Sequence, residues 1–398
     1  MDWTGSFQFR VPTRVVFGLN CVQGIGETAK GMGSKAPMVL TDPVVHKVGL
    51  TEGVEKSLKD AGLRVEVCAE VTTEPTLAAI EKAVAFYRER GCDLIVAVGG
   101  GSTMDSSKSI SLLLGNEGKL SEYHQMRVGA DWRPPKPIQR RGTEIISVPT
   151  TAGTGSEVDG GSGVFDPEAG IKKWAGSPLL APTVCFYDPL LTVSMPPRVT
   201  ADTGMDAFSQ VTEAYLRTAS KPISDTLGLK TIEIIGQYLP KAWANGKDIQ
   251  ARSAVMTASA MMGMAFPNGG LIHVHTFAEV LGDYTHLPHG RLIGLMLPHV
   301  LEFSLVGCAE KMVDIGRALG EKVDGIPARE GAEKALAAIK RLCAEVEINE
   351  PLRTHNVSEE TLGKVAEVVY AQHENRSATS PRGFRNLDEV MGILKKAY

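Results

Sequence analysis

Short apolar runs alternate with an amphipathic stretch of helical spacing early in the chain, and this alternation limits the folds that the chain can adopt. The apolar runs cover residues 37–41, 63–67 and 94–98, and residues 76–90 repeat apolar side chains at helical spacing. Runs of this length predict buried strands, and a strand–helix–strand order predicts a parallel sheet covered by helices. We therefore expect an α/β architecture with parallel strands in the first half of the chain.

The pattern changes about halfway along the chain. Strand-like runs largely disappear, and residues 201–217, 224–239 and 249–264 predict successive helices. A chain of 398 residues is long enough for two hydrophobic cores. We predict an α/β domain over residues 1–190 and an all-helical domain over residues 191–398.

Two further segments carry specific expectations. Apolar and polar side chains alternate over residues 7–17, on both sides of Pro12. This pattern predicts a hairpin at a sheet edge. Residues 253–278 contain no Asp, Glu, Lys or Arg, but polar side chains and an interruption at residues 267–270 leave no apolar run of about 20 residues. This second segment predicts a helix buried inside a helical domain rather than a membrane span.

The composition points to a small-molecule partner. The 42 basic and 46 acidic residues give a net charge of −4, which provides no electrostatic footprint for nucleic acid or for an anionic membrane. Residues 1–10 lack a basic region followed by an apolar run, so no secretory signal is expected and the protein is predicted to be cytoplasmic. The six cysteines lie far apart with no CxxC pair, which favours reduced, buried thiols over disulfides or a zinc ribbon.

A glycine-rich turn follows the apolar run at residues 94–98. The candidate cofactor-binding residues in it are Gly99, Gly100, Gly101, Ser102 and Asp105. Glycines let a backbone approach a ligand closely, and the free N–H groups of a helix N-terminus favour a pyrophosphate. A triple glycine without the GxGxxG pattern is often only a tight turn, but the strand before it, the helix after it and the nearby Lys108 favour a dinucleotide site.

Two other positions fit the same dinucleotide. The loop after residues 145–148 carries the hydroxyls of Thr150, Thr151, Thr154 and Ser156, and strand ends of a parallel sheet meet at one crevice. Asp42 ends the first predicted strand, where a carboxylate accepts hydrogen bonds from an adenosine ribose and repels a 2′-phosphate, so it favours NAD over NADP. A helix N-cap is an equally good account of Asp42.

The helical half holds a candidate metal site. Asp206 and Gln210 are four residues apart and share a helix face, and so do His275 and Glu279. His289 follows in a Pro-His-Gly turn, and five of the nine histidines fall between residues 273 and 299. Asp and His are ligands of catalytic divalent metals, so this clustering in an apolar region favours a functional site.

The ordered set of motifs resembles the iron-containing (group III) alcohol dehydrogenases over nearly the whole chain. The matching segments are GGGSTMDSSK at 99–108, PTTAGTGSE at 149–157, DP at 188–189, GMDA at 204–207, PHG at 288–290, LPHV at 297–300 and SPR at 380–382. The resemblance implies a Rossmann-like NAD(P)-binding domain and an all-helical domain that binds a divalent metal, with the substrate between them. It also implies at least a homodimer.

The resemblance further implies a ligand set of one Asp and three His. Asp206, His275 and His289 match three of these ligands, whereas Gln210 stands at the position of the remaining His. Glu279 stands where the family usually has another His near the nicotinamide. We take His275, Glu279 and His289 as candidate catalytic residues and Asp206, Gln210, His275 and His289 as candidate ligands of Fe2+ or Zn2+.

Gln210 leaves three interpretations of the metal site open. An amide oxygen is a weaker ligand than imidazole for late transition metals, so the metal is held either by these four residues, or with help from Glu279, or not at all. With a metal, the substrate oxygen is polarised while NAD exchanges a hydride with the adjacent carbon. Without one, a histidine donates the proton, as the resemblance to maleylacetate reductases implies.

We predict an NAD-dependent oxidoreductase that interconverts an alcohol and an aldehyde or ketone. A metal-independent reductase, a catalytically degenerate dinucleotide-binding member and a lyase resembling dehydroquinate synthase, which shares this two-domain architecture, remain as alternatives. Glu279 favours a substrate with a hydroxyl or cationic group over a plain alkyl alcohol.

Overall fold

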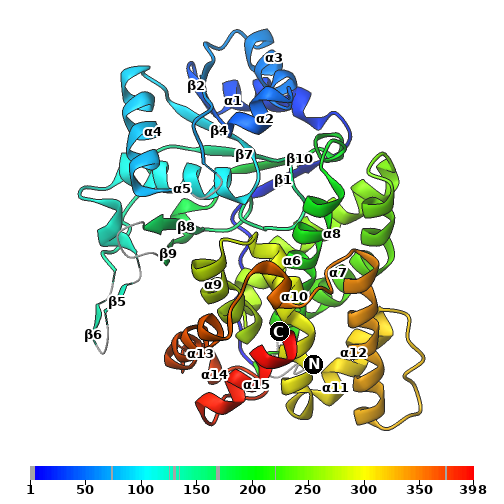
Figure 1. The fold of residues 1–398 in the computed structure, drawn as a ribbon. Coiled ribbons are helices and arrows are strands. Elements are labelled where there is room, and N and C mark those ends of the chain that lie inside the picture. The colour runs from blue at the N-terminus through cyan, green and yellow to red at the C-terminus, as the bar shows by residue number, and fades with distance from the viewer. Residues whose placement is uncertain are drawn as a thin grey trace. The chain divides into compact units, whose positions relative to one another are not determined.

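The computed structural model describes residues 5–72, 75–124, 126–128, 131–133, 135–166, 171–219, 221–372 and 374–398. The chain forms two compact units (Figure 1). One unit comprises Val11–Thr192, and the other comprises Met1–Arg10 with Val193–Tyr398.

A six-stranded parallel sheet forms the centre of the first unit. Its strand order is β1-β10-β7-β4-β2-β3, and every neighbouring pair is parallel. The strands are β1 (Arg14–Phe17), β2 (Pro37–Leu40), β3 (Glu66–Cys68), β4 (Leu94–Gly99), β7 (Ile145–Pro149) and β10 (Val184–Tyr187). Two antiparallel pairs lie outside it, β5 (Met126–Val128) with β6 (Asp131–Arg133) and β8 (Gly161–Asp166) with β9 (Ile171–Gly176).

Helices cover both faces of this sheet, which explains why its central strand is apolar throughout. All six residues of β4 are buried. Alternate side chains of a strand point to opposite faces, and Val96 packs in a cluster with Ile25 and Leu58 whereas Ile95 packs in another with Ile80 and Met104. The helices of this unit are α1 (Ile25–Gly31), α2 (Pro43–Lys47), α3 (Glu52–Asp60), α4 (Leu77–Glu89) and α5 (Gly101–Gly115), with 3-10 turns at Cys21–Gly24, Leu120–Tyr123, Pro178–Leu180 and Pro189–Thr192.

The predicted hairpin over residues 7–17 is wrong. Of these residues only Arg14–Phe17 form a strand, β1, and it pairs in parallel with β10 at the edge of the sheet. Alternation of apolar residues indicates a half-buried strand but carries no information on the direction of its partner. Here that partner comes from residues 184–187, far along the chain, so no tight turn is involved.

The second unit is helical, as the sequence predicts. Its helices are α6 (Pro197–Leu216), α7 (Pro222–Ala244), α8 (Ile249–Gly269), α9 (His273–Thr285), α10 (His289–Ser304), α11 (Ala309–Ala318), α12 (Ala328–Glu345), α13 (Glu359–Gln372), α14 (Glu374–Ser377) and α15 (Leu387–Ala397), with 3-10 turns at Leu305–Gly307 and Leu352–His355. Helix α8 continues through Pro267 and ends at Gly269, followed by Gly270, whose φ of 90° suits glycine, so the chain leaves the helix within the predicted interruption at residues 267–270. The architecture of an α/β domain followed by an all-α domain is confirmed.

One helical stretch of the described residues has the length and composition of a membrane span. It covers His289–Gly307, and 72% of its most apolar window is buried inside the structure. The core helix of a folded domain has the same properties, so this stretch is weak evidence for a membrane.

Candidate active site

Three helices of the second unit bring Asp206, His275 and His289 together. Asp206 lies within α6, His275 lies in the first turn of α9, and His289 is the first residue of α10. One donor atom of each lies within 4.8 Å of the others, with Asp206 Oδ1 3.6 Å from His275 Nε2 and 4.0 Å from His289 Nε2. One carboxylate oxygen and two imidazole nitrogens at this spacing form a donor set that suits a divalent transition metal.

Glu213 fixes the orientation of the His275 ring. Its carboxylate accepts a hydrogen bond from His275 Nδ1, and its Oε2 also accepts from the backbone N–H groups of Ile272 at 3.0 Å and Val274 at 3.1 Å. The other ring nitrogen, Nε2, lies 3.6 Å from Asp206 Oδ1. A carboxylate behind a ligating histidine is the usual means of setting the tautomer in metal sites.

Sequence reasoning missed Glu213, although a signal was present. Residues 206, 210 and 213 recur at helical spacing and therefore share one face of α6. Glu213 is fully buried on that face. A carboxylate at such a position is expected to have a charged or hydrogen-bonding partner, because an unpaired buried charge is costly.

The electrostatics of the group favour positive charge at its centre. Burial alone lowers the pKa of His275, but the Glu213 and Asp206 carboxylates outweigh it and raise that pKa to about 10. Burial raises the pKa of Asp206, yet the neighbouring His275 and His289 bring it below its ordinary value. The carboxylates thus stabilise a cation beside the imidazole nitrogens, which is the property that a metal site needs.

Gln210 supplies one more atom to this group. Its amide nitrogen donates a hydrogen bond to Asp206 Oδ1 at 2.9 Å. Its carbonyl oxygen is buried and has no hydrogen-bond partner among the described residues. A buried acceptor without a partner is uncommon in proteins and fits an oxygen that a cation or a ligand hydroxyl would satisfy. The residues present therefore fit a divalent metal.

Glu279 is not brought into the donor set. It lies one turn beyond His275 on α9, and both of its carboxylate oxygens accept from Arg376 Nη2, at 3.2 and 3.3 Å. Arg376 also donates to Thr276 Oγ1 at 3.0 Å. Arg376 is thus the partner of Glu279. These contacts do not support the interpretation in which Glu279 completes the set of metal ligands.

In the first unit, the two predicted cofactor loops lie against each other. A Cβ added to Gly100 would meet Thr151 Cγ2 at 3.4 Å, and one added to Gly101 would meet Thr154 Cγ2 at 3.0 Å. The backbone N–H of Thr150 donates to the Gly99 carbonyl at 2.9 Å. A side chain at position 101 would therefore crowd the second loop, and α5 begins at this glycine, directly after β4.

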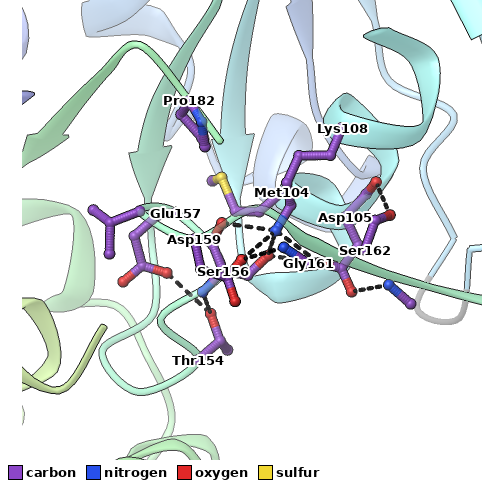
Figure 2. Close-up of polar contacts among 12 residues, drawn as sticks. Met104, Asp105, Lys108, Thr154, Ser156, Glu157, Asp159, Gly161, Ser162 and Pro182 are labelled. Atoms are coloured by element: carbon purple, nitrogen blue, oxygen red, sulfur yellow. Dashed lines mark hydrogen bonds and ion pairs between the residues drawn. The ribbon is translucent and has the colours of Figure 1, made fainter. Parts of the chain in front are cut away.

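Lys108 anchors the second loop from inside the unit (Figure 2). Its side chain is completely buried, and Nζ donates to the Ser156 carbonyl at 3.0 Å, to Ser156 Oγ at 2.7 Å and to Asp159 Oδ1 at 2.7 Å. Asp105 accepts from Ser156 Oγ at 2.5 Å and from the Gly163 N–H at 3.0 Å. Lys108 therefore holds the loop in place and is not a group that faces a phosphate.

The remaining predicted cofactor residues have mixed surroundings. Asp105 and Ser156 belong to the hydrogen-bonded network around the buried Lys108 side chain. Their contacts therefore indicate that they support the loop after β7. Ser102 lies in the first turn of α5, where its carbonyl accepts from Ser106 Oγ at 2.8 Å. Asp42 caps α2, since its Oδ1 accepts from the N–H groups of Val44 at 2.8 Å and Val45 at 2.9 Å, and its contact with a ribose stays a prediction.

Replacing Glu213 with glutamine is expected to lower metal affinity by about 10- to 100-fold, because the amide no longer fixes the tautomer and basicity of His275. Chelator competition monitored by the activity and metal content of the purified variant checks this. Ser209→Ala is a matched control, since the Ser209 hydroxyl donates to Glu213 Oε1 at 3.1 Å and is not itself a candidate ligand. Unchanged affinity in Glu213→Gln would contradict the role given to Glu213.

Comparisons with known proteins agree with this architecture. The family model for iron-containing alcohol dehydrogenases matches residues 12–189, and the model for the C-terminal part of the same family matches residues 200–398. The chain is 33% identical over 393 residues to the NAD-dependent methanol dehydrogenase of Bacillus methanolicus, covering 98% of this chain and 99% of that protein. It is 35% identical over 369 residues to long-chain-alcohol dehydrogenase 1 of Geobacillus thermodenitrificans, covering 93% and 91% of the two chains.

Solved structures show the same similarity. A crystal structure of 1,3-propanediol oxidoreductase superposes with a TM-score of 0.92 at 33% identity, covering 99% of this chain and all of the other. An alcohol dehydrogenase from Oenococcus oeni gives a TM-score of 0.92 at 31% identity and covers 99% and 100%. The fold and the site thus define a dehydrogenase that acts on CH–OH groups. The chain belongs to the iron-containing alcohol dehydrogenase family.

Proposed function

We propose that this alcohol dehydrogenase uses NAD and a divalent metal held by Asp206, His275 and His289, with the carbonyl oxygen of Gln210 as the fourth ligand. The observation that carries the proposal is the donor set of the three side chains within 4.8 Å. The unpartnered Gln210 Oε1 beside it supports the fourth ligand. Mixed oxygen and imidazole donors favour Fe2+ or Zn2+ over Mg2+ or Ca2+.

A divalent metal bound there would act as a Lewis acid toward the substrate oxygen. The chain's own residues then have distinct tasks. Glu213 holds His275 in one tautomer, and the carboxylate of Asp206 balances positive charge in a buried site. The balanced reaction moves a hydride from the carbinol carbon to the nicotinamide, while the hydroxyl proton leaves, so that alcohol and NAD+ become carbonyl compound, NADH and H+.

NAD is favoured over NADP by Asp42, which lies two residues after the end of β2, since a carboxylate there disfavours a 2′-phosphate. The name of the Bacillus methanolicus relative, an NAD-dependent methanol dehydrogenase, supports the same cofactor. The substrate is a small-molecule alcohol, or the corresponding aldehyde or ketone. We also expect a homodimer or higher homo-oligomer in the cytoplasm, where the six free thiols remain reduced.

Metal-independent reduction is the second candidate, and the exposure of His289 favours it. The His289 side chain is 43% exposed, whereas Asp206 and His275 are buried. An exposed imidazole is able to exchange a proton with solvent and deliver it to a carbonyl oxygen. In this case Asp206 and Gln210 would orient the ring rather than bind an ion.

Metal removal separates the two candidates. If the metal is held by three side chains and a weak amide ligand, dialysis against a chelator is expected to remove it. The alcohol-oxidising activity is expected to be lost with the metal and to return when Fe2+ or Zn2+ is added back. Gln210→His is expected to hold the metal at least about 10-fold more tightly, because imidazole replaces an amide oxygen. Full activity in metal-free protein, measured by elemental analysis, would exclude the metal-dependent mechanism, and fluorescence titration with NADH tests the cofactor independently.

A further inference from the structure

The place of His289 in the donor set depends on where α10 begins. His289 is the first residue of that helix, and Pro288 before it provides no side-chain cap. The first turn of a helix leaves N–H groups without partners inside the helix, so contacts with other elements determine its position. His289 Nε2 lies 4.0 Å from Asp206 Oδ1, and a displacement of about 1 Å is enough to disturb such a site. The contacts of the first turn of α10 therefore bear directly on the metal ligands.

Arg291 holds this turn from two sides. It follows His289 by two residues, and only 4% of its surface is exposed. On one side, its Nε lies 2.8 Å from Asp202 Oδ1, an ion pair with α6. On the other side, its Nη1 donates to the Glu347 carbonyl at 2.5 Å and to Glu350 Oε1 at 3.2 Å. Arg291 thus joins the start of α10 both to α6 and to the segment that follows α12.

The helices carrying two of the ligands also meet backbone to backbone at this point. A Cβ added to Gly290 would lie 2.2 Å from the Asp202 carbonyl oxygen, so α10 begins in direct contact with α6. Gly290 directly follows His289, and Asp202 lies about one helical turn before Asp206. The ion pair of Arg291 with Asp202 therefore secures the contact that sets the spacing between the two ligands.

We propose that Arg291 is a positioning residue for the metal site, which fixes the start of α10 against α6 so that His289 and Asp206 keep the spacing that a metal requires. This inference rests on the proposed metal-dependent function. A guanidinium has N–H donors and no acceptor, so Arg291 acts through His289 and is not itself a ligand. Its planar fork of donors serves two carboxylates and a carbonyl oxygen at once, which the single ammonium of a lysine does less well.

The test is the affinity of the full-length protein for Zn2+, measured by competition with a chromophoric chelator at a temperature where circular dichroism shows each variant to be folded. Asp202→Asn/Arg291→Gln removes both charges of the pair, and glutamine is too short to reach both sides of the contact. The Zn2+ affinity of this variant is expected to fall by about 10- to 100-fold, as for other partners of metal ligands. The visible absorption of bound Co2+ is expected to change as well, because it reports the geometry of the donor set.

Two single variants isolate the contribution of the arginine. Asp202→Asn keeps an oxygen where Oδ1 lies and retains Arg291, so its Zn2+ affinity is expected to equal that of the unaltered protein. Arg291→Lys keeps the charge but reaches fewer acceptors, and an intermediate affinity is expected. If the double variant does not fold, Arg291→Lys decides the question, and an unchanged affinity in it overturns the positioning role.

Arg252→Gln is the matched control for the loss of a buried arginine. Arg252 is 2% exposed and ties α8 to the start of α6, since it donates to Thr200 Oγ1 at 2.8 Å and to the Met195 carbonyl at 3.1 Å. None of the candidate ligands lies on α8. Arg252→Gln is therefore expected to lower the free energy of unfolding and to leave the Zn2+ affinity unchanged.

The outcomes separate this inference from the proposed function. Equal Zn2+ affinity in the folded double variant and in the unaltered protein overturns the role of Arg291, while the metal site stands. An equal loss of affinity in Arg252→Gln also overturns it, because any buried arginine of the unit would then have the same effect. Failure of the unaltered protein to bind Zn2+, Fe2+ or Co2+ overturns the proposed metal-dependent function, and the inference with it.

Discussion

Asp206→Asn is expected to lower kcat/KM for alcohol oxidation by on the order of 1,000-fold and to leave the purified protein without its metal. Asp206 is the carboxylate of the donor set, and its Oδ1 lies 3.6 Å from His275 Nε2. Asparagine keeps the shape and still accepts the Gln210 hydrogen bond, but it removes the negative charge that offsets the charge of a buried cation. Lewis-acid assistance contributes several kcal/mol to such a reaction, and each 1.36 kcal/mol corresponds to about tenfold in rate.

Asp202→Asn is the matched control, because Asp202 lies one turn earlier on α6 and is also buried. Its partner is Arg291, whose Nε lies 2.8 Å from Asp202 Oδ1, so this variant is expected to lose stability while the folded fraction keeps its metal. Elemental analysis of both variants, with steady-state kinetics and thermal unfolding, gives the comparison. A metal content in Asp206→Asn equal to that of the unaltered protein would rule out Asp206 as a ligand.

Lys108→Met is expected to lower the free energy of unfolding by about 3–5 kcal/mol, since it leaves buried carboxylates without their cation. Burial lowers the pKa of Lys108, but Asp159 and Asp105 outweigh it and raise the pKa above its ordinary value, so the lysine is charged. Asp105 has only 6% of its surface exposed, and Asp159 lies 2.7 Å from Nζ. Removing Nζ also ends the two bonds to Ser156 that hold the loop after β7.

Lys172→Met provides the control for this effect. Lys172 Nζ lies 3.9 Å from the same Asp105, yet its side chain is 43% exposed. An exposed ion pair contributes about 1 kcal/mol or less, so this variant is expected to unfold at nearly the same urea concentration as the unaltered protein. Equal losses in the two variants would show that the burial of Lys108 does not determine its contribution.

Periodicity in the sequence was sufficient to predict the elements whose environment is uniform along their length. Strand β4 is buried on both faces and α4 has one apolar face, so each carries a clear signal, and residues 94–98 and 76–90 anticipate them closely. Strand β1 shows the limit of this approach, because its parallel pairing with β10 depends on chain that lies far away in sequence.

The site was predictable where short sequence motifs mark it, and obscure where a distant partner determines a contact. The resemblance carried by the motifs around Asp206, His275 and His289 implied these three ligands, and the structure brings them together. Arg376, the partner of Glu279, lies 97 residues away in the sequence, so no local pattern reveals the pair. The sequence also does not say whether a lysine beside a glycine turn faces the interior or a ligand. In the structure, the side chain of Lys108 is buried and faces the interior.

The placement of the two histidines at helix starts has an electrostatic consequence for the reaction. His275 lies in the first turn of α9 and His289 is the first residue of α10, so both helices begin at the donor set. The peptide dipoles of a helix give its N-terminus a partial positive charge, which stabilises a nearby anion by about 0.3–1 kcal/mol. At the start of α9 that anion is the Glu213 carboxylate, which accepts from the N–H groups of Ile272 and Val274. The helix that carries His275 thus helps to keep ionised the buried carboxylate that orients the His275 ring.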